Sequence, residues 1–387
     1  MNSPPSKRFV NLTRGDPAPW FRARSTGNPQ YNFSLAAGRF IVLCFYGTAA
    51  DDTGRGAIAA IEANRTLFDD RRISLFGVSF DPADEREQRV AESIPGIRHF
   101  WDFDGAVSRA YGAIAEDEPL TAKMRYRRFW MVIDPTLRVR AVFPFDAGHD
   151  AVFAALRDLP QPGLFAGFEI HAPIIMLPDV FEPELCKRLI DAYEINGSKE
   201  TGFMMERDGI TTMKMDPDRK RRRDHMLTDE KLIAAARARI ARRISPEIRK
   251  IHQFNPTRIE RYIVSCYASE DQGHFTQHRD NTTKGTAHRR FAVSINLNAE
   301  FEGGEISFPE YGPRSFKPPP GGAVVFSCSL LHAVSPVTQG RRFAFLPFLF
   351  DEEAAKLREA NRQFLDDAIY DTGAKAGQPQ ATDVENS

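Results

Sequence analysis

Short apolar runs alternate with helix-periodic stretches through the first 160 residues. Runs rich in β-branched and aromatic residues predict buried strands at 40–46, 72–80 and 127–134. Apolar residues at helical spacing predict helices at 54–69, 104–114 and 149–158. Residues 137–144 alternate after a turn, so they predict a hairpin partner for the third strand. This order of elements predicts an α/β sandwich over residues 1–160.

A cluster of Pro and Gly interrupts this pattern at 158–173, and we place a linker between two domains there. Beyond the linker, residues 182–195 and 228–246 predict amphipathic helices. Pro183 stands at an early position of the first of these helices, where proline is favoured. The charge run at 216–224 predicts a solvated loop or the start of a helix.

From about residue 257 the sequence pattern changes to that of short strands separated by Gly/Pro turns. These strands are predicted at 259–267, 289–298, 304–308, 323–327 and 342–350. Such a series predicts a β-sandwich or barrel over residues 168–352. Along 289–298 the large apolar residues share one face, and Ala, Ser and Asn residues share the other. The second face is typical of a ligand cavity.

Composition adds little to this division into domains. The 387 residues hold 52 Lys+Arg and 52 Asp+Glu, so charge gives no reason to expect nucleic acid or a membrane surface as the main partner. No apolar run reaches eighteen residues, and the N-terminus lacks the apolar core of a secretory signal. The four cysteines lie far apart, at 44, 186, 266 and 328, which is typical of a reducing cytoplasm. Residues 353–370 are expected to form a C-terminal helix, and the polar stretch 371–387 a disordered tail.

Candidate metal ligands stand in the β-rich half. His278 and Asp280 are two residues apart, so in an extended segment both side chains point to one face. His332 lies one predicted strand further on, where a neighbouring strand could supply a third ligand. Two His and one carboxylate on one face of an octahedral ion are the ligand set of non-haem Fe(II) oxygenases. His274 shares the same predicted strand face and is a rival ligand.

An arginine pair follows the distal histidine. Arg342 comes ten residues after His332, at the start of the predicted apolar strand 342–350. An Arg beside a polar cavity needs an anionic partner, and a dicarboxylate would supply one through a bidentate pair. The alternatives are that Arg342 forms only a salt bridge at the rim, or that Arg341 is the residue that faces the cavity.

The order of motifs over residues 174–350 resembles that of 2-oxoglutarate/Fe(II)-dependent dioxygenases of the prolyl 4-hydroxylase-like superfamily. The matching stretches are HFTQHRD, FEGGEISF, PPPGGAVVFS and LHAVSPVTQGRRFAF. The resemblance implies a double-stranded β-helix (jelly roll) with iron on His278, Asp280 and His332. It further implies that 2-oxoglutarate binds through Arg342, with Tyr267 or Tyr262 and Asn296 as further candidates. The segment between Tyr267 and His278 is longer and more acidic than usual, which leaves the tyrosine open.

The first 160 residues resemble the peroxiredoxin branch of the thioredoxin fold, on the stretches GDPAPWF, FIVLCFY, FWDFDGAVSRAYG and RFWMVID. In that family a Thr is followed three residues later by the nucleophilic cysteine at a helix N-terminus. Thr48 is followed at that position by Asp51, so the nucleophile is absent, although Arg128 matches the activating Arg. Cys44 lies inside an apolar strand and reads as a small hydrophobic residue. The domain could dock substrate, position it, form a homodimer or serve structure alone.

The resemblance implies a hydroxylase that couples the oxidative decarboxylation of 2-oxoglutarate to the oxidation of a substrate C–H bond by dioxygen. Succinate and CO2 are released, and ascorbate is expected as a reductant. The substrate, a small molecule or a protein side chain, is not indicated, although the basic run Lys220–Arg223 could face an acidic one. The alternatives are a non-catalytic scaffold of two degenerate domains and a thiol peroxidase that acts through the first domain.

Overall fold

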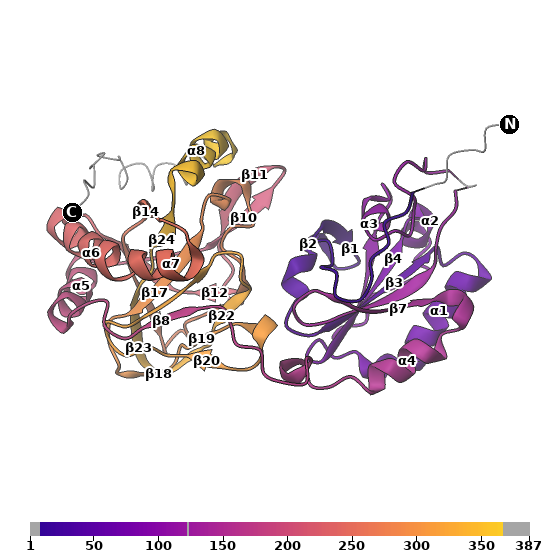
Figure 1. The fold of residues 1–387 in the computed structure, drawn as a ribbon, viewed down its shortest axis with the longest axis horizontal. Coiled ribbons are helices and arrows are strands. Elements are labelled where there is room, and N and C mark those ends of the chain that lie inside the picture. The colour runs from indigo at the N-terminus through magenta and orange to yellow at the C-terminus, as the bar shows by residue number, and fades with distance from the viewer. Residues whose placement is uncertain (1–7, 122–123, 367–387) are drawn as a thin grey trace. The chain divides into compact units, whose positions relative to one another are not determined.

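The computed structural model describes residues 8–121 and 124–366 (Figure 1). The chain divides into two compact units, the first made of Met1–Ala172 with Pro309–Pro313, the second of Pro173–Phe308 with Arg314–Ser387. Each unit is described by itself. The predicted tail 371–387 and the last residues of the predicted helix 353–370 lie outside the described residues. None of the helices in the described part of the chain is long and apolar enough to cross a membrane.

The first unit is built on a seven-stranded mixed sheet. Its strands are β1 (Arg22–Ser25), β2 (Asn28–Asn32), β3 (Phe40–Gly47), β4 (Ile73–Ser79), β5 (Ile97–Trp101), β6 (Phe129–Ile133) and β7 (Val139–Pro144). The strand order is β2-β1-β5-β4-β3-β6-β7, with β3, β4 and β5 parallel and the other neighbours antiparallel. The predicted hairpin between the third strand and residues 137–144 is confirmed by the pairing of β6 with β7.

Both faces of this sheet are covered, which explains why its central strands are apolar throughout. The helices are α1 (Asp52–Ala63), α2 (Pro82–Arg86), α3 (Ala106–Ala110) and α4 (Asp150–Arg157). Ile61 of α1 and Leu156 of α4 pack with Val42 of β3 on one face. On the other face Phe33, Phe76 and other aromatic rings pack edge to face. The α/β sandwich of thioredoxin type is confirmed, with α1 and α3 shorter than the predicted helices.

The second unit contains two antiparallel sheets that form a double-stranded β-helix, as predicted. Strands of the larger sheet are β8 (Ile175–Leu177), β9 (Lys199–Glu200), β13 (Arg223–Met226), β14 (Arg258–Glu260), β15 (Ile263–Ala268), β17 (Phe291–Asn296), β18 (Phe301–Gly303), β21 (Ala323–Ser327), β23 (Val337–Phe345) and β24 (Phe348–Phe350). Strands of the smaller sheet are β12 (Lys220–Arg221), β16 (His274–His278), β22 (His332–Val334), β19 (Ile306–Ser307) and β20 (Ser315–Phe316), in that spatial order. A separate hairpin joins β10 (Phe203–Arg207) and β11 (Ile210–Lys214).

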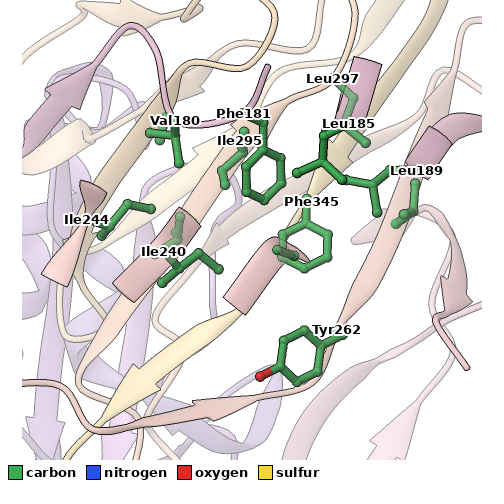
Figure 2. Packing of buried hydrophobic residues seen from close by; sticks show 14 of the residues in the cluster. Val180, Phe181, Leu185, Leu189, Ile240, Ile244, Tyr262, Ile295, Leu297 and Phe345 are labelled. Carbon is green, nitrogen blue, oxygen red and sulfur yellow. The ribbon is translucent and has the colours of Figure 1, made fainter. Parts of the chain in front are cut away.

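Helices cover the outer face of the larger sheet. They are α5 (Pro183–Asn196), α6 (Glu230–Arg243) and α7 (Ser245–His252), and α8 (Glu352–Ala360) follows β24. Figure 2 shows Leu185 and Leu189 of α5 and Ile240 of α6 gathered against Ile295 and Phe345 of the sheet. This cluster buries the apolar face predicted for residues 289–298, so the small and polar residues of that strand point to the inner face.

Several predictions about elements of this unit are wrong. The predicted strand 342–350 is the end of β23 and the whole of β24, separated at Leu346 and Pro347, and the helix predicted from residue 353 ends at Ala360. The predicted strand 259–267 is two strands, because Arg261 has a left-handed backbone (φ 54°) that interrupts the ladder between β14 and β15. The predicted helix 228–246 ends at Arg243, and α7 begins at Ser245 just before Pro246. The charge run 216–224 is not a solvated loop or a helix start, since it contains β12 and the start of β13.

Candidate active site

Three predicted metal ligands meet at the edge where β16 and β22 pair. His278 is the last residue of β16, Asp280 lies in the turn just beyond it, and His332 opens β22. His278 and His332 are direct partners in the ladder. The Nε2 atoms of His278 and His332 lie 3.7 Å and 3.4 Å from the two carboxylate oxygens of Asp280. One donor atom from each residue lies within 4.8 Å of the others, close enough to share one ion.

Backbone carbonyls orient both imidazoles. Nδ1 of His278 lies 2.8 Å from the carbonyl of Thr276, and Nδ1 of His332 lies 3.0 Å from that of Leu330. A carbonyl can only accept a hydrogen bond, so each Nδ1 donates and each Nε2 keeps its lone pair for a metal. Burial lowers the pKa of His278 well below its ordinary value, with a smaller contribution from His332. The neutral imidazole that metal binding requires is therefore favoured.

His274, the rival ligand, does not reach this group. Its two ring nitrogens lie 2.8 Å and 3.2 Å from the backbone carbonyls of Gln272 and Asp218. His274 starts the strand that His278 ends, and the ladder is irregular between Phe275 and His278. That irregularity turns the ring of Phe275 onto His278, with ring centroids 3.5 Å apart. The alternation that made His274 a rival is lost at this bulge.

Arg342 is buried on the inner face of the larger sheet, with 1% of its surface exposed. Its Nε donates to Oδ1 of Asn296 at 3.0 Å, and its Nη2 donates to Oγ of Ser294 at 2.8 Å. Its Nη1 is buried without any hydrogen-bond partner. Arg342 is not at a strand start as predicted, because β23 begins at Val337 and continues as far as Phe345. A buried guanidinium with a free donor and no acid is a site prepared for an anion.

The structure separates the other candidates for the co-substrate site. Tyr267 is the ladder partner of Arg342, whose guanidinium carbon lies 5.4 Å from the centre of the tyrosine ring. Tyr262 belongs to the outer apolar cluster that Figure 2 shows, so it does not join this group. Arg341 is 40% exposed and pairs with Glu194 at 2.7 Å, which excludes it as the inward-facing arginine. The structure therefore brings Arg342, Asn296 and Tyr267 together.

The position of the missing nucleophile in the first unit is filled by an ion pair. Asp51 caps α1, since its Oδ1 accepts a hydrogen bond from the Gly54 amide at 2.8 Å. Its other oxygen accepts from Nη2 of Arg128. Cys44 is fully buried in β3, and burial raises the pKa of its thiol well above the ordinary value. These residues leave no thiolate at the helix N-terminus.

Comparison with known families agrees with this geometry. Residues 258–350 match the 2OG-Fe(II) oxygenase superfamily, and residues 14–142 match the AhpC/TSA family. The second unit is a 2OG-Fe(II) oxygenase domain. The first unit is a peroxiredoxin-like domain of the AhpC/TSA family.

Curated relatives match the oxygenase half of the chain. A PKHD-type hydroxylase of Polaromonas sp. is 31% identical over 140 residues, which cover 33% of this chain and 58% of that protein. Proteins of the same name are 29% identical over 120 residues in Verminephrobacter eiseniae (29% of this chain, 49% of that protein) and 38% identical over 80 residues in Cupriavidus metallidurans (18% and 35%). The chain thus spans between 35% and 58% of the length of these relatives.

The residues of the oxygenase domain fit the two groups in the family name. Two imidazole Nε2 atoms and one carboxylate on one side of an ion are a ligand set for Fe(II) that leaves positions open. The free Nη1 of Arg342 matches the need of a buried dicarboxylate for a charged donor. Both observations concern side chains that are nearly or fully buried, where an unmatched charge is costly.

A buried ion pair beside Arg342 went unpredicted. Arg222 donates from Nη2 to Oδ2 of Asp224 at 2.7 Å, and its Nη1 lies 3.4 Å from the hydroxyl of Tyr267. Lys220 is also buried, and its Nζ donates to Oγ1 of Thr201 at 2.9 Å. Arg222 and Asp224 are two residues apart, the same spacing that made His278 and Asp280 noticeable, so a signal was present in the sequence.

A second buried pair contacts the backbone of Asp280, the candidate carboxylate ligand. Arg289 forms an ion pair with Glu260, since its Nη2 lies 2.6 Å from one carboxylate oxygen. Its Nη1 lies 3.4 Å from the backbone carbonyl of Asp280. The charge of Arg289 is the largest favourable cause that holds the pKa of Glu260 well below its usual range, against the effect of burial. Asp280 is held from its other side by the hydrogen bond of its amide to the carbonyl of Cys328.

Proposed function

We propose that this chain is an Fe(II)- and 2-oxoglutarate-dependent hydroxylase. It would use dioxygen to oxidise a C–H bond of a small-molecule or protein substrate, releasing succinate and CO2. The observation that carries the proposal is the pairing of a three-ligand cluster with a buried arginine, Arg342, that lacks an anion. The curated relatives, which are named hydroxylases, support the same reaction class.

In this proposal His278, Asp280 and His332 hold the metal. Bound Fe(II) supplies the redox chemistry by which 2-oxoglutarate and dioxygen are activated. Nη1 of Arg342 would donate to the distal carboxylate of 2-oxoglutarate, while Asn296 and Ser294 fix the direction of the guanidinium. The chain's contribution is to orient these groups and to keep water from them.

Supporting residues keep this arrangement rigid. Phe275 stacks on His278, and the carbonyls of Thr276 and Leu330 hold both imidazoles in one tautomer. Tyr267 lies between the guanidinium groups of Arg342 and Arg222, at 5.4 Å and 5.8 Å from its ring centre. We assign Tyr267 a part in binding the co-substrate. Ascorbate as a reductant, and a reducing cytoplasm as the compartment, belong to the proposal too, the latter because all four cysteines are free.

The test is succinate release from 2-oxoglutarate by iron-loaded protein, compared in air and under nitrogen. We expect Asp280→Ala and His278→Ala to lower oxygen-dependent release by about 100-fold or more, because metal ligands matter at least as much as the groups that orient them. His274→Ala is the matched control and should retain the activity, since this His lies outside the cluster. Loss in His274→Ala but not in Asp280→Ala, or wild-type protein that never binds 2-oxoglutarate, would contradict the proposal.

A further inference from the structure

Arg261 presents a cationic group on the same inner face as Arg342. It stands at the break between β14 and β15, and its guanidinium carbon lies 4.3 Å from the ring centre of Phe348. Phe348 is the ladder partner of Ala292, two residues before the Ser294 that binds Arg342. Residues two apart on a strand share a face, so Arg261 and Arg342 stand over neighbouring positions of one surface.

The same aromatic ring connects Arg261 to the metal ligands. Arg289 lies over Phe348 as well, with its guanidinium carbon 4.1 Å from the ring centre. Arg289 in turn lies 3.4 Å from the backbone carbonyl of Asp280. Arg261 is thus separated from a metal ligand by one ring and one side chain.

Arg261 differs from Arg289 in having no acid of its own. Its Nε donates to the carbonyl of Leu346 at 3.2 Å. Within the part of the chain that the structure describes, no carboxylate lies at ion-pair distance from it, and Nη1 and Nη2 have no hydrogen-bond partner. Burial lowers the pKa of Arg261 to about 10; the charges of Arg289 and Arg222 act in the same direction, and those of Glu260 and Asp224 act against it. The guanidinium is thus partly desolvated without being neutralised.

The other buried arginines on this inner face show the same contrast. Arg222 and Arg289 lie at ion-pair distance from Asp224 and Glu260, whereas Arg261 and Arg342 have no carboxylate at that distance among the described residues. Bound 2-oxoglutarate would supply an anion to Arg342. Arg261 would keep a positive charge without a counter-charge, which is unfavourable for a desolvated cation. An anion from a third molecule would relieve this imbalance.

We propose that the primary substrate carries a carboxylate, which binds to Nη1 and Nη2 of Arg261 while the oxidised carbon lies near the metal. This inference rests on the proposed function. Nε of Arg261 is held by Leu346, so the terminal edge of the guanidinium is the part that is presented to a ligand. Two parallel hydrogen bonds from that edge match the geometry of a carboxylate.

The experiment compares acids with their amides on the full chain. Protein loaded with Mn(II) and saturating 2-oxoglutarate, without oxygen, is titrated calorimetrically with three pairs of probes. The pairs are N-acetyl-aspartate α-amide with N-acetyl-asparagine α-amide, N-acetyl-glutamate α-amide with N-acetyl-glutamine α-amide, and N-acetylproline with N-acetylprolinamide. Saturating 2-oxoglutarate keeps the probes from Arg342. At least one acid should bind about tenfold or more tightly than its amide, as a charge-assisted pair implies.

Variants then test whether Arg261 is the residue responsible for the preference for acids over amides. Arg261→Gln should abolish the difference between acid and amide, Arg261→Lys should retain part of it, and Arg341→Gln, which changes an exposed arginine, should leave it intact. Equal binding of acids and amides, no measurable binding of any acid, or a preference that persists in Arg261→Gln would overturn the inference. Wild-type protein that binds 2-oxoglutarate but shows no preference refutes only this inference, whereas protein that fails to bind 2-oxoglutarate refutes the proposed function.

Discussion

The two units of this chain differ in whether a key arginine is paired with an acid of the protein. In the peroxiredoxin-like domain Arg128 faces Asp51, so the cation that would have lowered the pKa of a thiol is neutralised by the protein itself. In the oxygenase domain Arg342 is buried more deeply, yet one of its nitrogens has no partner. Asp51 occupies the position at Arg128 where an anion could bind. No acid of the protein occupies the corresponding position at Nη1 of Arg342, so that arginine can bind an anion from outside.

This difference separates arginines that stabilise the fold from arginines that serve a ligand. Arg222 and Arg289 belong with Arg128, because Asp224 and Glu260 lie within ion-pair distance of them. Removing an arginine of this class should cost stability. Removing Arg342 should cost binding and should not cost stability in the ligand-free protein, because an uncompensated buried charge is itself unfavourable.

The largest expected effect is on Arg222. Arg222→Met leaves Asp224 buried with only part of its compensation, so the oxygenase domain should lose about 3 kcal/mol of unfolding free energy. All three tryptophans lie in the first unit, so calorimetry or circular dichroism, rather than tryptophan fluorescence, must follow this transition. The double variant Arg222→Met/Asp224→Leu should recover part of the loss. A single variant as stable as wild type would place Arg222 in the other class.

A slightly smaller effect is expected on the co-substrate. Arg342→Gln should raise the Kd for 2-oxoglutarate about 100-fold, which corresponds to about 2.7 kcal/mol for a buried charge-assisted contact. The unfolding free energy of the ligand-free domain should be unchanged or higher, as measured by calorimetry. Arg341→Gln is the control for both measurements. A variant that binds normally but unfolds more easily would mean that Arg342 serves the fold alone.

The smallest effect concerns the cap of α1. Asp51→Ala removes a side-chain cap and an ion pair, and should lower the unfolding free energy of the first unit by about 1 kcal/mol. Asp51→Asn keeps the capping oxygen and loses only the pair with Arg128, which should cost about 0.5 kcal/mol. Tryptophan fluorescence during urea unfolding distinguishes the two variants. Equal losses would show that the ion pair, not the cap, carries the contribution.

Much of the site could be predicted because its residues follow simple periodicities. Alternation along 289–298 divided the strand into an apolar outer face and a polar inner face, and the latter includes the Ser294 and Asn296 that bind Arg342. The separation of His278 from Asp280 by one residue placed two side chains together. Helix and strand order also sufficed for the thioredoxin-like sheet of the first unit.

Other features depend on contacts between distant segments, which no local sequence pattern indicates. The charge run at 216–224 looked solvated because Lys and Arg usually are, yet both Lys220 and Arg222 are buried. Lys220 lies in the ladder between β12 and β16, and Arg222 forms an ion pair with Asp224. The break at Arg261 comes from one left-handed residue, a conformation that arginine rarely adopts and that no local pattern indicates. Both errors concern charged residues of the oxygenase domain whose burial or backbone conformation depends on partners that are distant in sequence.

The candidate metal ligands lie at the end of β16, just beyond it and at the start of β22, and this placement has a consequence for the stability of the protein in a cell. A metal ion bound by His278, Asp280 and His332 would cross-link two segments that are far apart in sequence. A ligand that binds only the folded state adds about 2.7 kcal/mol when its concentration is 100 times its Kd. Resistance to proteolysis would then follow the supply of the metal. Cells short of iron would hold less of the protein, in addition to less active protein.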